Sequence, residues 1–228
     1  MDFDKNLLIA NYQAVKQQLD TANHAANRTQ PASLLAVSKT KPAAMIAALF
    51  ELGQRDFGEN YLQEALGKMG ELGDLPIVWH YIGSIQRNKT KDIAKHFDWV
   101  HTLERDIIAK RLNEQRAGLP PLNVLIQVNI DDEDSKSGCQ PQDVPALIDA
   151  ILACDNLRLR GLMVIPSKDG SDAFMRTKAL FDEMAARYQL PSWDSISMGM
   201  SSDMAAAVTH GSTMVRVGTA IFGSRNYD

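Results

Sequence analysis

The feature that most constrains the fold is a repeated alternation of short apolar segments with segments that carry apolar residues at helical spacing. Eight apolar segments have the length and composition of buried strands, and the helical patterns between them close at glycine or proline stop signals. The predicted strands are residues 34–39, 56–61, 77–83, 99–104, 122–130, 157–165, 195–200 and 212–223. This pattern is typical of an α/β fold whose strands are joined through helices.

A closed (β/α)8 barrel, the TIM barrel, fits this alternation best. Each predicted strand but the last is followed by a helix, and the 228 residues are about the length that such a barrel needs. An open doubly wound sheet would normally have a glycine-rich turn after its first strand, and none follows LLAVSK at 34–39. An extra N-terminal helix, with Leu8, Tyr12, Val15 and Leu19 on one face, is expected to supply the missing cover.

Composition and charge exclude several classes of function. No low-complexity linker divides the chain, so residues 1–228 are predicted to form a single domain. A net charge of −4 gives no basic footprint for nucleic acid. The N-terminal segment lacks the apolar core of a signal peptide and no later run could span a bilayer, which favours a cytoplasmic protein without membrane contact. The two cysteines, Cys139 and Cys154, form neither a disulfide framework nor a zinc spacing and are interpreted as ordinary thiols.

The carboxyl ends of barrel strands meet at one face, where barrel enzymes place their sites. In this sequence the ends are mostly polar: Lys39, Asn60, His80, Tyr81, Thr102, Asn129, Met163, residues 197–201 and residues 216–219. They include no pair of carboxylates suited to glycoside hydrolysis. The histidines are too scattered to form a metal site, so neither kind of chemistry is expected.

Lys39 is the strongest nucleophile of this set, although most lysines at strand ends simply extend into solvent. To form a Schiff base, its amine must lose a proton from a pKa of about 10.4, and partial burial next to a cation such as Arg216 would lower that pKa. Lys41 would share the same strand face, but Pro42 favours a helix start that carries Lys41 onto the rim. The residues alone leave the choice between the two lysines open.

The last two strands end in residues suited to an anion. Residues 201–203 read SSD, cap-type residues that leave backbone N–H groups available at a helix start. The final strand offers Gly218 and Thr219, and phosphate sites in barrels are often built after strands seven and eight. Taken singly, SMGMS reads equally well as a tight turn and Arg216 as a salt-bridge partner. Together with Lys39 they fit a small aldehyde that carries a phosphate, of which pyridoxal 5'-phosphate is the common cofactor.

Seven segments of the chain closely resemble the pyridoxal phosphate homeostasis protein family, which is related to the N-terminal barrel of alanine racemase. They are LLAVSKTKP, FGENYLQE, WHYIGSIQRNK, VNIDDEDSKSG, RLRGLMVIP, SMGMSSDM and TMVRVGTAIFG. The resemblance runs from about the first strand to the C-terminus. It departs from the family's usual pattern at Ser84, where proline is common, at Arg87, where serine is common, and at the SSD motif, where SDD is common. These changes leave any role of the loop after the third strand unassigned.

The resemblance implies a (β/α)8 barrel that binds pyridoxal 5'-phosphate. It assigns the cofactor to Lys39, Asn60, His80, Ser201, Arg216, Gly218 and Thr219, and Met163 is added to the site as a pocket filler. Lys39 would hold the cofactor as an aldimine, with Arg216 directed at it. Ser201, Gly218 and Thr219 would contact the phosphate, the asparagine and the histidine would line the surroundings of the ring, and the methionine would fill the pocket.

Several residues keep two interpretations at this stage. Lys136 stands in the acidic segment DDEDSKSG, where it is by default a solvated charge, although its position after the fifth strand also lets it reach the barrel mouth. His80 is expected to pack against the edge of the ligand rather than to act as a base. Met198 and Met200 are expected to fill the core and the pocket.

The expected function is binding without catalysis. Chemistry at the Cα of an amino acid needs an electron sink and an acid/base on each face. The resemblance to alanine racemase suggests that Arg216 faces the pyridine nitrogen, which would weaken the sink. In alanine racemase the second acid/base is a tyrosine from an additional C-terminal domain, which we do not expect in this chain, since it ends at Asp228. We expect a monomeric carrier with no catalytic residue that buffers pyridoxal phosphate or delivers it to apo-enzymes in vitamin B6 homeostasis. A weak amino-acid racemase and a phosphosugar enzyme with a lysine Schiff base remain as alternatives.

Overall fold

Eight parallel strands close into a barrel in which each strand pairs with the next and β8 pairs with β1. The structure is a computed structural model that describes residues 3–133, 136–167 and 172–224. The strands are β1 (Ser33–Val37), β2 (Asp56–Glu59), β3 (Val78–Tyr81), β4 (Trp99–Leu103), β5 (Leu122–Val128), β6 (Leu157–Val164), β7 (Ser195–Ser197) and β8 (Met214–Val217). The predicted (β/α)8 architecture is confirmed.

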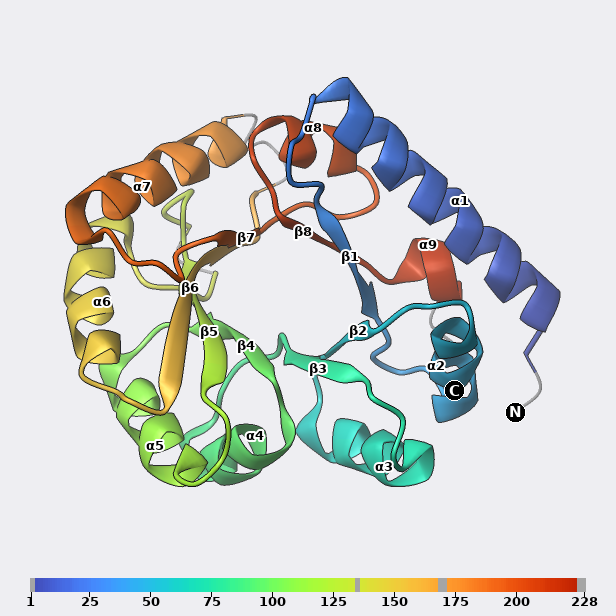
Figure 1. The fold of residues 1–228 in the computed structure, drawn as a ribbon, viewed down its shortest axis with the longest axis horizontal. Helices are drawn as coiled ribbons and strands as arrows, with labels where there is room; N and C mark the ends of the chain where they lie inside the picture. The colour runs from blue at the N-terminus through green and yellow to red at the C-terminus, as the bar shows by residue number, and fades with distance from the viewer. Residues whose placement is uncertain (1–2, 134–135, 168–171, 225–228) are drawn as a thin grey trace.

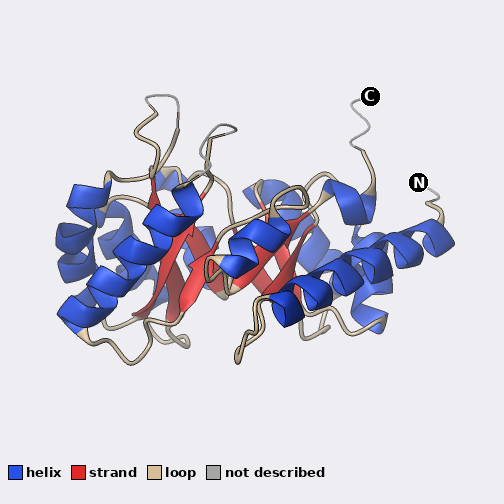
Figure 2. Cartoon of the chain, turned by 90° about the horizontal axis from the view of Figure 1, so that it is seen from above, coloured by secondary structure: helices blue, strands red, loops and turns tan. Residues whose placement is uncertain are grey.

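Helices form the outer layer around this barrel (Figures 1 and 2). They are α1 (Lys5–Ala25), α2 (Ala43–Glu51), α3 (Leu62–Leu72), α4 (Thr90–His96), α5 (Asp106–Arg116), α6 (Val144–Leu152), α7 (Ala173–Tyr188), α8 (Met204–Thr209) and α9 (Thr219–Phe222). Short 3-10 turns at Arg87–Lys89 and Pro141–Asp143 precede α4 and α6. Within the described ranges, no helix combines the length and the apolar character needed to cross a membrane.

The extra N-terminal helix, α1, covers the barrel where the first and last strands meet. The Asp4 side chain caps it by accepting a hydrogen bond from the Leu7 N–H at 3.0 Å. Its buried face carries the residues predicted from their spacing, which are Leu8, Tyr12, Val15 and Leu19. Because α1 packs against α8, α9 and β1 (Figure 1), it supplies the cover that the sequence predicts.

The end of the eighth strand differs from the prediction. The sequence predicts one strand over 212–223, but β8 ends before Gly218 and the four-residue helix α9 begins at Thr219. The Gly218 carbonyl accepts the Ile221 N–H at 2.9 Å, which starts the helical turn. A short apolar run fits a buried strand and a buried helix equally well, so the pattern alone does not separate them. The prediction that no helix follows the last strand is wrong.

The seventh strand is also shorter than the predicted 195–200. Gly199 has a φ of +93°, a left-handed conformation that favours glycine and turns the chain away from the sheet. The Asp203 carboxylate then accepts the Met200 N–H at 2.5 Å, immediately before α8 begins. Because the strand ends early, this turn places Ser201 at the cavity in the barrel mouth.

Candidate functional site

A cavity of about 230 Å³ opens at the carboxyl ends of the strands. Every predicted site residue except His80 lines it. These residues are Lys39, Asn60, Met163, Ser201, Arg216, Gly218 and Thr219. Closure of the barrel therefore brings together side chains from the two ends and the middle of the sequence.

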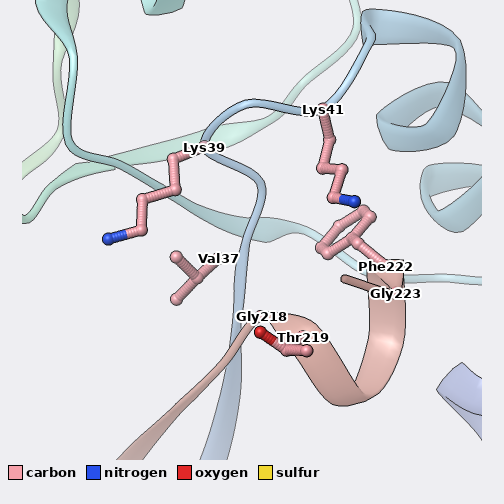
Figure 3. A pocket seen from close by; sticks show the side chains of 7 residues that line it. All are labelled: Val37, Lys39, Lys41, Gly218, Thr219, Phe222 and Gly223. Atoms are coloured by element: carbon pink, nitrogen blue, oxygen red, sulfur yellow. The ribbon is translucent and has the colours of Figure 1, made fainter. Parts of the chain in front are cut away.

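The two neighbouring lysines after β1 point in different directions. In Figure 3, Lys41 extends toward Phe222 and Gly223, whereas Lys39 points away from them. The Lys41 ammonium donates to the Ser224 carbonyl at 2.7 Å, outside the cavity that contains Arg216. The structure thus places Lys41 on the rim, as its position before a proline indicates, and Lys39 at the cavity.

A buried cluster of charged residues holds the backbone on both sides of the cavity lysine. The Lys68 ammonium, on α3, donates to the Ser38 carbonyl and to Glu59 Oε1, each at 2.8 Å, and pairs with Glu64 at 2.5 Å. The Ser38 hydroxyl donates to Glu59 at 2.6 Å, and the Thr40 N–H donates to Glu64 at 2.5 Å. Burial raises the pKa of Glu59, against the opposing effect of the ammonium. The loop after β1 is therefore fixed by α3.

Two chain turns form the opposite side of the cavity. Ser201 lies in the turn between β7 and α8, and Gly218 and Thr219 lie where β8 passes into α9. A Cβ on Gly218 would lie 3.2 Å from the Val37 carbonyl oxygen, so glycine lets β8 approach β1 closely. Two hydroxyl groups and the backbone of two turns thus face one hollow, an arrangement suited to an anion.

Arg216 is the buried cation of the cavity, with 7% of its surface exposed. Its guanidinium donates from Nη1 to Ser197 Oγ and from Nη2 to the Val164 carbonyl, both at 2.9 Å. Burial lowers the pKa of Arg216 to about 10, which leaves the guanidinium charged at neutral pH. Both hydrogen-bond acceptors are uncharged, and the Asp203 carboxylate, which acts on the guanidinium electrostatically, is the charge that a ligand would share it with.

Comparison with known proteins identifies the family. Residues 10–226 match the family described as alanine racemase, N-terminal domain. The pyridoxal phosphate homeostasis protein of Pseudomonas aeruginosa is 54% identical, over 95% of each chain. That of Escherichia coli K12 is 47% identical, over 97% of this chain and 98% of the relative. The chain belongs to the pyridoxal phosphate homeostasis protein family.

Solved structures agree with this membership of the pyridoxal phosphate homeostasis protein family. PipY of Synechococcus elongatus, solved with PLP bound, is 32% identical with a TM-score of 0.82, covering 95% of this chain and all of PipY. Alanine racemase from Corynebacterium glutamicum is 18% identical with a TM-score of 0.74, covering 97% of this chain and 61% of the racemase. The racemase likeness shows a shared fold alone.

His80 lies inside the barrel and not at the cavity. Its Nε2 is 2.9 Å from the Asp56 carboxylate, and its Nδ1 is 2.9 Å from Nε2 of His101. Because side chains alternate along a strand, Ile82 shares the face of His80 and lies one step nearer the mouth, where it lines the cavity. Tyr81 points the other way and packs edge-on against a phenylalanine of the helical layer, as its alternation with His80 predicts.

Apolar residues complete the cavity wall. Met200 is there as the sequence predicts, whereas the sequence analysis did not select Val37, Ile82 and Ile165. Each stands within a few residues of a selected position, so proximity to the strand ends was the signal that could have identified them. Met198, in contrast, is fully buried in the core.

Lys136 reaches the barrel mouth, but its ammonium is buried beside carboxylates and is not the solvated charge of the default interpretation. Its ammonium lies 3.3 Å from the Glu133 carboxylate and 3.9 Å from Asp131. It also lines a second hollow of about 270 Å³ that shares Asn60 and Ile82 with the cavity. Lys136 is thus an ion-paired residue close to the barrel mouth.

The cysteines lie outside the cavity. Burial raises the pKa of the Cys139 thiol to about 12 and also raises that of Cys154. A protonated thiol is a poor nucleophile and a poor metal ligand, in keeping with ordinary thiols. Among the described residues, no group of three or more histidine, cysteine or acidic side chains is arranged to hold a metal ion.

Proposed function

We propose that the chain binds pyridoxal 5'-phosphate in the cavity at the barrel mouth and takes part in the homeostasis of this cofactor. The observation that carries the proposal is a single hollow that combines the amine of Lys39, the buried cation of Arg216 and the hydroxyls of Ser201 and Thr219. The amine suits an aldehyde, and the cation and the hydroxyls suit anionic oxygens. Family membership and the PipY structure with PLP bound support it.

Lys39 is the proposed point of covalent attachment. Its amine, once uncharged, would hold the cofactor by condensing with the aldehyde, with loss of one water molecule. Apolar side chains such as Ile82 and Met163 are available to pack against the ring, and Gly218 leaves room for close approach of a phosphate. The carrier role, in which the protein buffers the cofactor or hands it to apo-enzymes, follows from this reversible bond.

We propose binding without turnover. A guanidinium that faced the pyridine nitrogen, as the racemase resemblance suggests for Arg216, would keep that nitrogen unprotonated and weaken the electron sink that catalysis at Cα requires. The strand-end tyrosine, Tyr81, donates its hydroxyl to the Ser84 carbonyl at 3.1 Å and packs outside the barrel. It is therefore unsuited to serve as a second acid/base beside Lys39.

The test of binding is the colour of the purified protein and the site of its chemical fixation. The protein should absorb in the visible region, and borohydride should fix a phosphopyridoxyl group on the peptide that contains Lys39. Lys39→Ala should lose the colour, whereas the matched variant Lys41→Ala should retain it. Recovery of the label mainly on Lys41 or Lys136 would overturn the assignment.

The test of the carrier role is a transfer experiment beside an activity screen. Common amino acids such as L-alanine and L-serine should give no racemase, decarboxylase or transaminase turnover above that of free cofactor. The loaded protein should activate an apo-enzyme of the pyridoxal phosphate class. Turnover that disappears with Lys39→Ala would replace the carrier with the racemase alternative. Monomeric state and cytoplasmic location stay predictions, for sedimentation and fractionation to examine.

A further inference from the structure

A line of polar side chains crosses the barrel interior from the cavity to the opposite face. Arg216 Nη1 lies 2.9 Å from Ser197 Oγ, which lies 3.0 Å from His101 Nδ1. His101 Nε2 lies 2.9 Å from His80 Nδ1, and His80 Nε2 lies 2.9 Å from Asp56 Oδ1. We call these five residues the interior chain. Its middle members are fully buried, whereas the Asp56 side chain, at the start of β2, is 36% exposed.

For neutral imidazole rings, the chemistry of the two ends sets the direction of the hydrogen bonds between them. The Arg216 guanidinium only donates and the ionised Asp56 carboxylate only accepts. The Ser197 hydroxyl accepts from the guanidinium and donates to Nδ1 of His101. His101 then carries its proton on Nε2 and donates to Nδ1 of His80, which donates from Nε2 to Asp56. In this order both rings carry their proton on Nε2.

The opposite order of bonds requires one more proton. If His101 donated from Nδ1 to Ser197, His80 would have to donate from Nδ1, and its Nε2 would face the Asp56 carboxylate. Two acceptors would then meet unless a proton were added at that end. Burial and Arg216 oppose an added proton on His101, whereas the Asp56 carboxylate lies against His80 at the other end.

Burial gives the same result for His101. The pKa of His101 is held well below its usual value by burial first, and then by His80 and Arg216. A neutral ring has one donor and one acceptor nitrogen, which is what the two neighbours of His101 require. For neutral rings, the geometry and the burial of His101 therefore agree on one proton order.

We propose that the interior chain positions Arg216 for the ligand, so that Asp56, on the far face of the barrel, acts on ligand binding through Ser197 and the two histidines. The ligand side of this inference rests on the proposed function. Two of the five guanidinium N–H groups are held, one by Ser197 and one by the Val164 carbonyl. Donation from Ser197 to His101 polarises the hydroxyl and makes its oxygen a better acceptor for Arg216. The residues beyond Arg216 are positioning residues.

The proton order is testable without any ligand. Long-range ¹H–¹⁵N correlation spectra of the labelled protein at neutral pH should show bare Nδ1 and protonated Nε2 for both His80 and His101. Loss of the corresponding signals in His80→Asn and His101→Asn assigns them. An Nδ1–H tautomer or a charged imidazolium at either ring would overturn the inference. Because this readout needs no cofactor, it stands apart from the proposed function.

The coupling to the ligand is testable with a double-mutant cycle and pyridoxal 5'-phosphate as the probe. Ser197→Ala should weaken binding about 10-fold, and Asp56→Ala about 3-fold, within the usual range for linked residues. The double variant should bind no more weakly than Ser197→Ala alone, because Ser197→Ala already interrupts the interior chain. Effects that multiply, or an unchanged affinity in either single variant, would overturn the positioning role.

Two further variants separate coupling from a general loss of structure. Asp56→Asn keeps a side-chain oxygen that accepts from His80 and should bind nearly as well as the natural chain. Asp155→Ala removes an exposed carboxylate that precedes β6 on the same face and should leave affinity unchanged. Equal weakening by Asp155→Ala and Asp56→Ala would overturn the inference. Failure of the unmodified protein to bind the cofactor would instead refute the proposed function.

Discussion

At the scale of single residues, the burial of Arg216 decides what the cavity can hold. Removing a guanidinium from water is costly unless its N–H groups find partners. Ser197 Oγ and the Val164 carbonyl satisfy two of these groups without neutralising the charge. A buried cation with uncharged partners keeps its electrostatic attraction for an anionic ligand, in a setting where water screens it weakly. Arg216 is therefore expected to attract an anionic ligand more strongly than a solvent-exposed arginine would.

The first prediction concerns the two sides of this cavity. Arg216→Ala should weaken cofactor binding by roughly 1.5 to 3 kcal/mol, because it removes a charged donor. Ser201→Ala should weaken binding less, since the backbone N–H groups of its turn remain. Fluorescence titration of the cofactor measures both. An affinity unchanged by Arg216→Ala would show that the guanidinium serves the barrel interior and not the ligand.

At the scale of elements, the loop that carries the cavity lysine depends on a helix that does not touch the cavity. Lys68 on α3 is 5% exposed and directs its ammonium at Glu59, Glu64 and the carbonyl of Ser38. Removing one partner of a buried ion pair leaves the other charge without compensation. The position of the loop is thus set by the interface of β1, β2 and α3.

The second prediction follows from this buried pair. Lys68→Met should lower the free energy of unfolding by about 3 to 5 kcal/mol, because Glu59 would remain buried without its partner. Lys5→Met breaks the exposed pair with Glu51 and should change stability by less than about 1 kcal/mol. Urea unfolding of the two variants compares them directly. Similar effects from both would contradict the role given to the buried cluster.

The sequence predicted the elements better than it predicted their ends. Hydrophobic period identified the strands and α1, because buried faces repeat at fixed spacing. It misjudged where β7 and β8 stop, since Gly199 and Gly218 act through backbone geometry and contacts with other strands. It gave no sign of Lys68, because two of its partners come from β2 and from the loop after β1 and are recognisable only once the barrel closes.

The same limit explains why the sequence analysis placed His80 at the ligand. The alternation of side chains predicts that His80 points into the barrel, but its depth there depends on where β3 ends and on its neighbours in β2 and β4. The sequence therefore brought seven of the eight selected residues to the cavity, with His80 left below it. The partners that make His80 part of a chain, Asp56 and His101, come from separate strands.

At the scale of the whole molecule, closing the barrel buries polar side chains that an open sheet could leave in contact with water. His80, His101 and Ser197 are all 0% exposed, in the space that a packed barrel normally fills with apolar side chains. Burial is tolerated because each of these side chains has hydrogen-bond partners within the interior. The stability of the fold is therefore linked to the protonation of its interior.

The last prediction is a fall in stability below about pH 6.5 that originates at His101. Above that pH the ring is neutral in both states. Below it, the unfolded chain takes up a proton that the buried ring, with its lowered pKa, does not accept, so the free energy of unfolding falls toward the folded-state pKa. The slope contributed by one such group approaches about 1.4 kcal/mol per pH unit. Urea unfolding across this range measures it, and His101→Asn, whose amide does not titrate, should show a shallower dependence. Equal slopes in the two proteins would mean that His101 takes up its proton in the folded barrel as readily as in the unfolded chain.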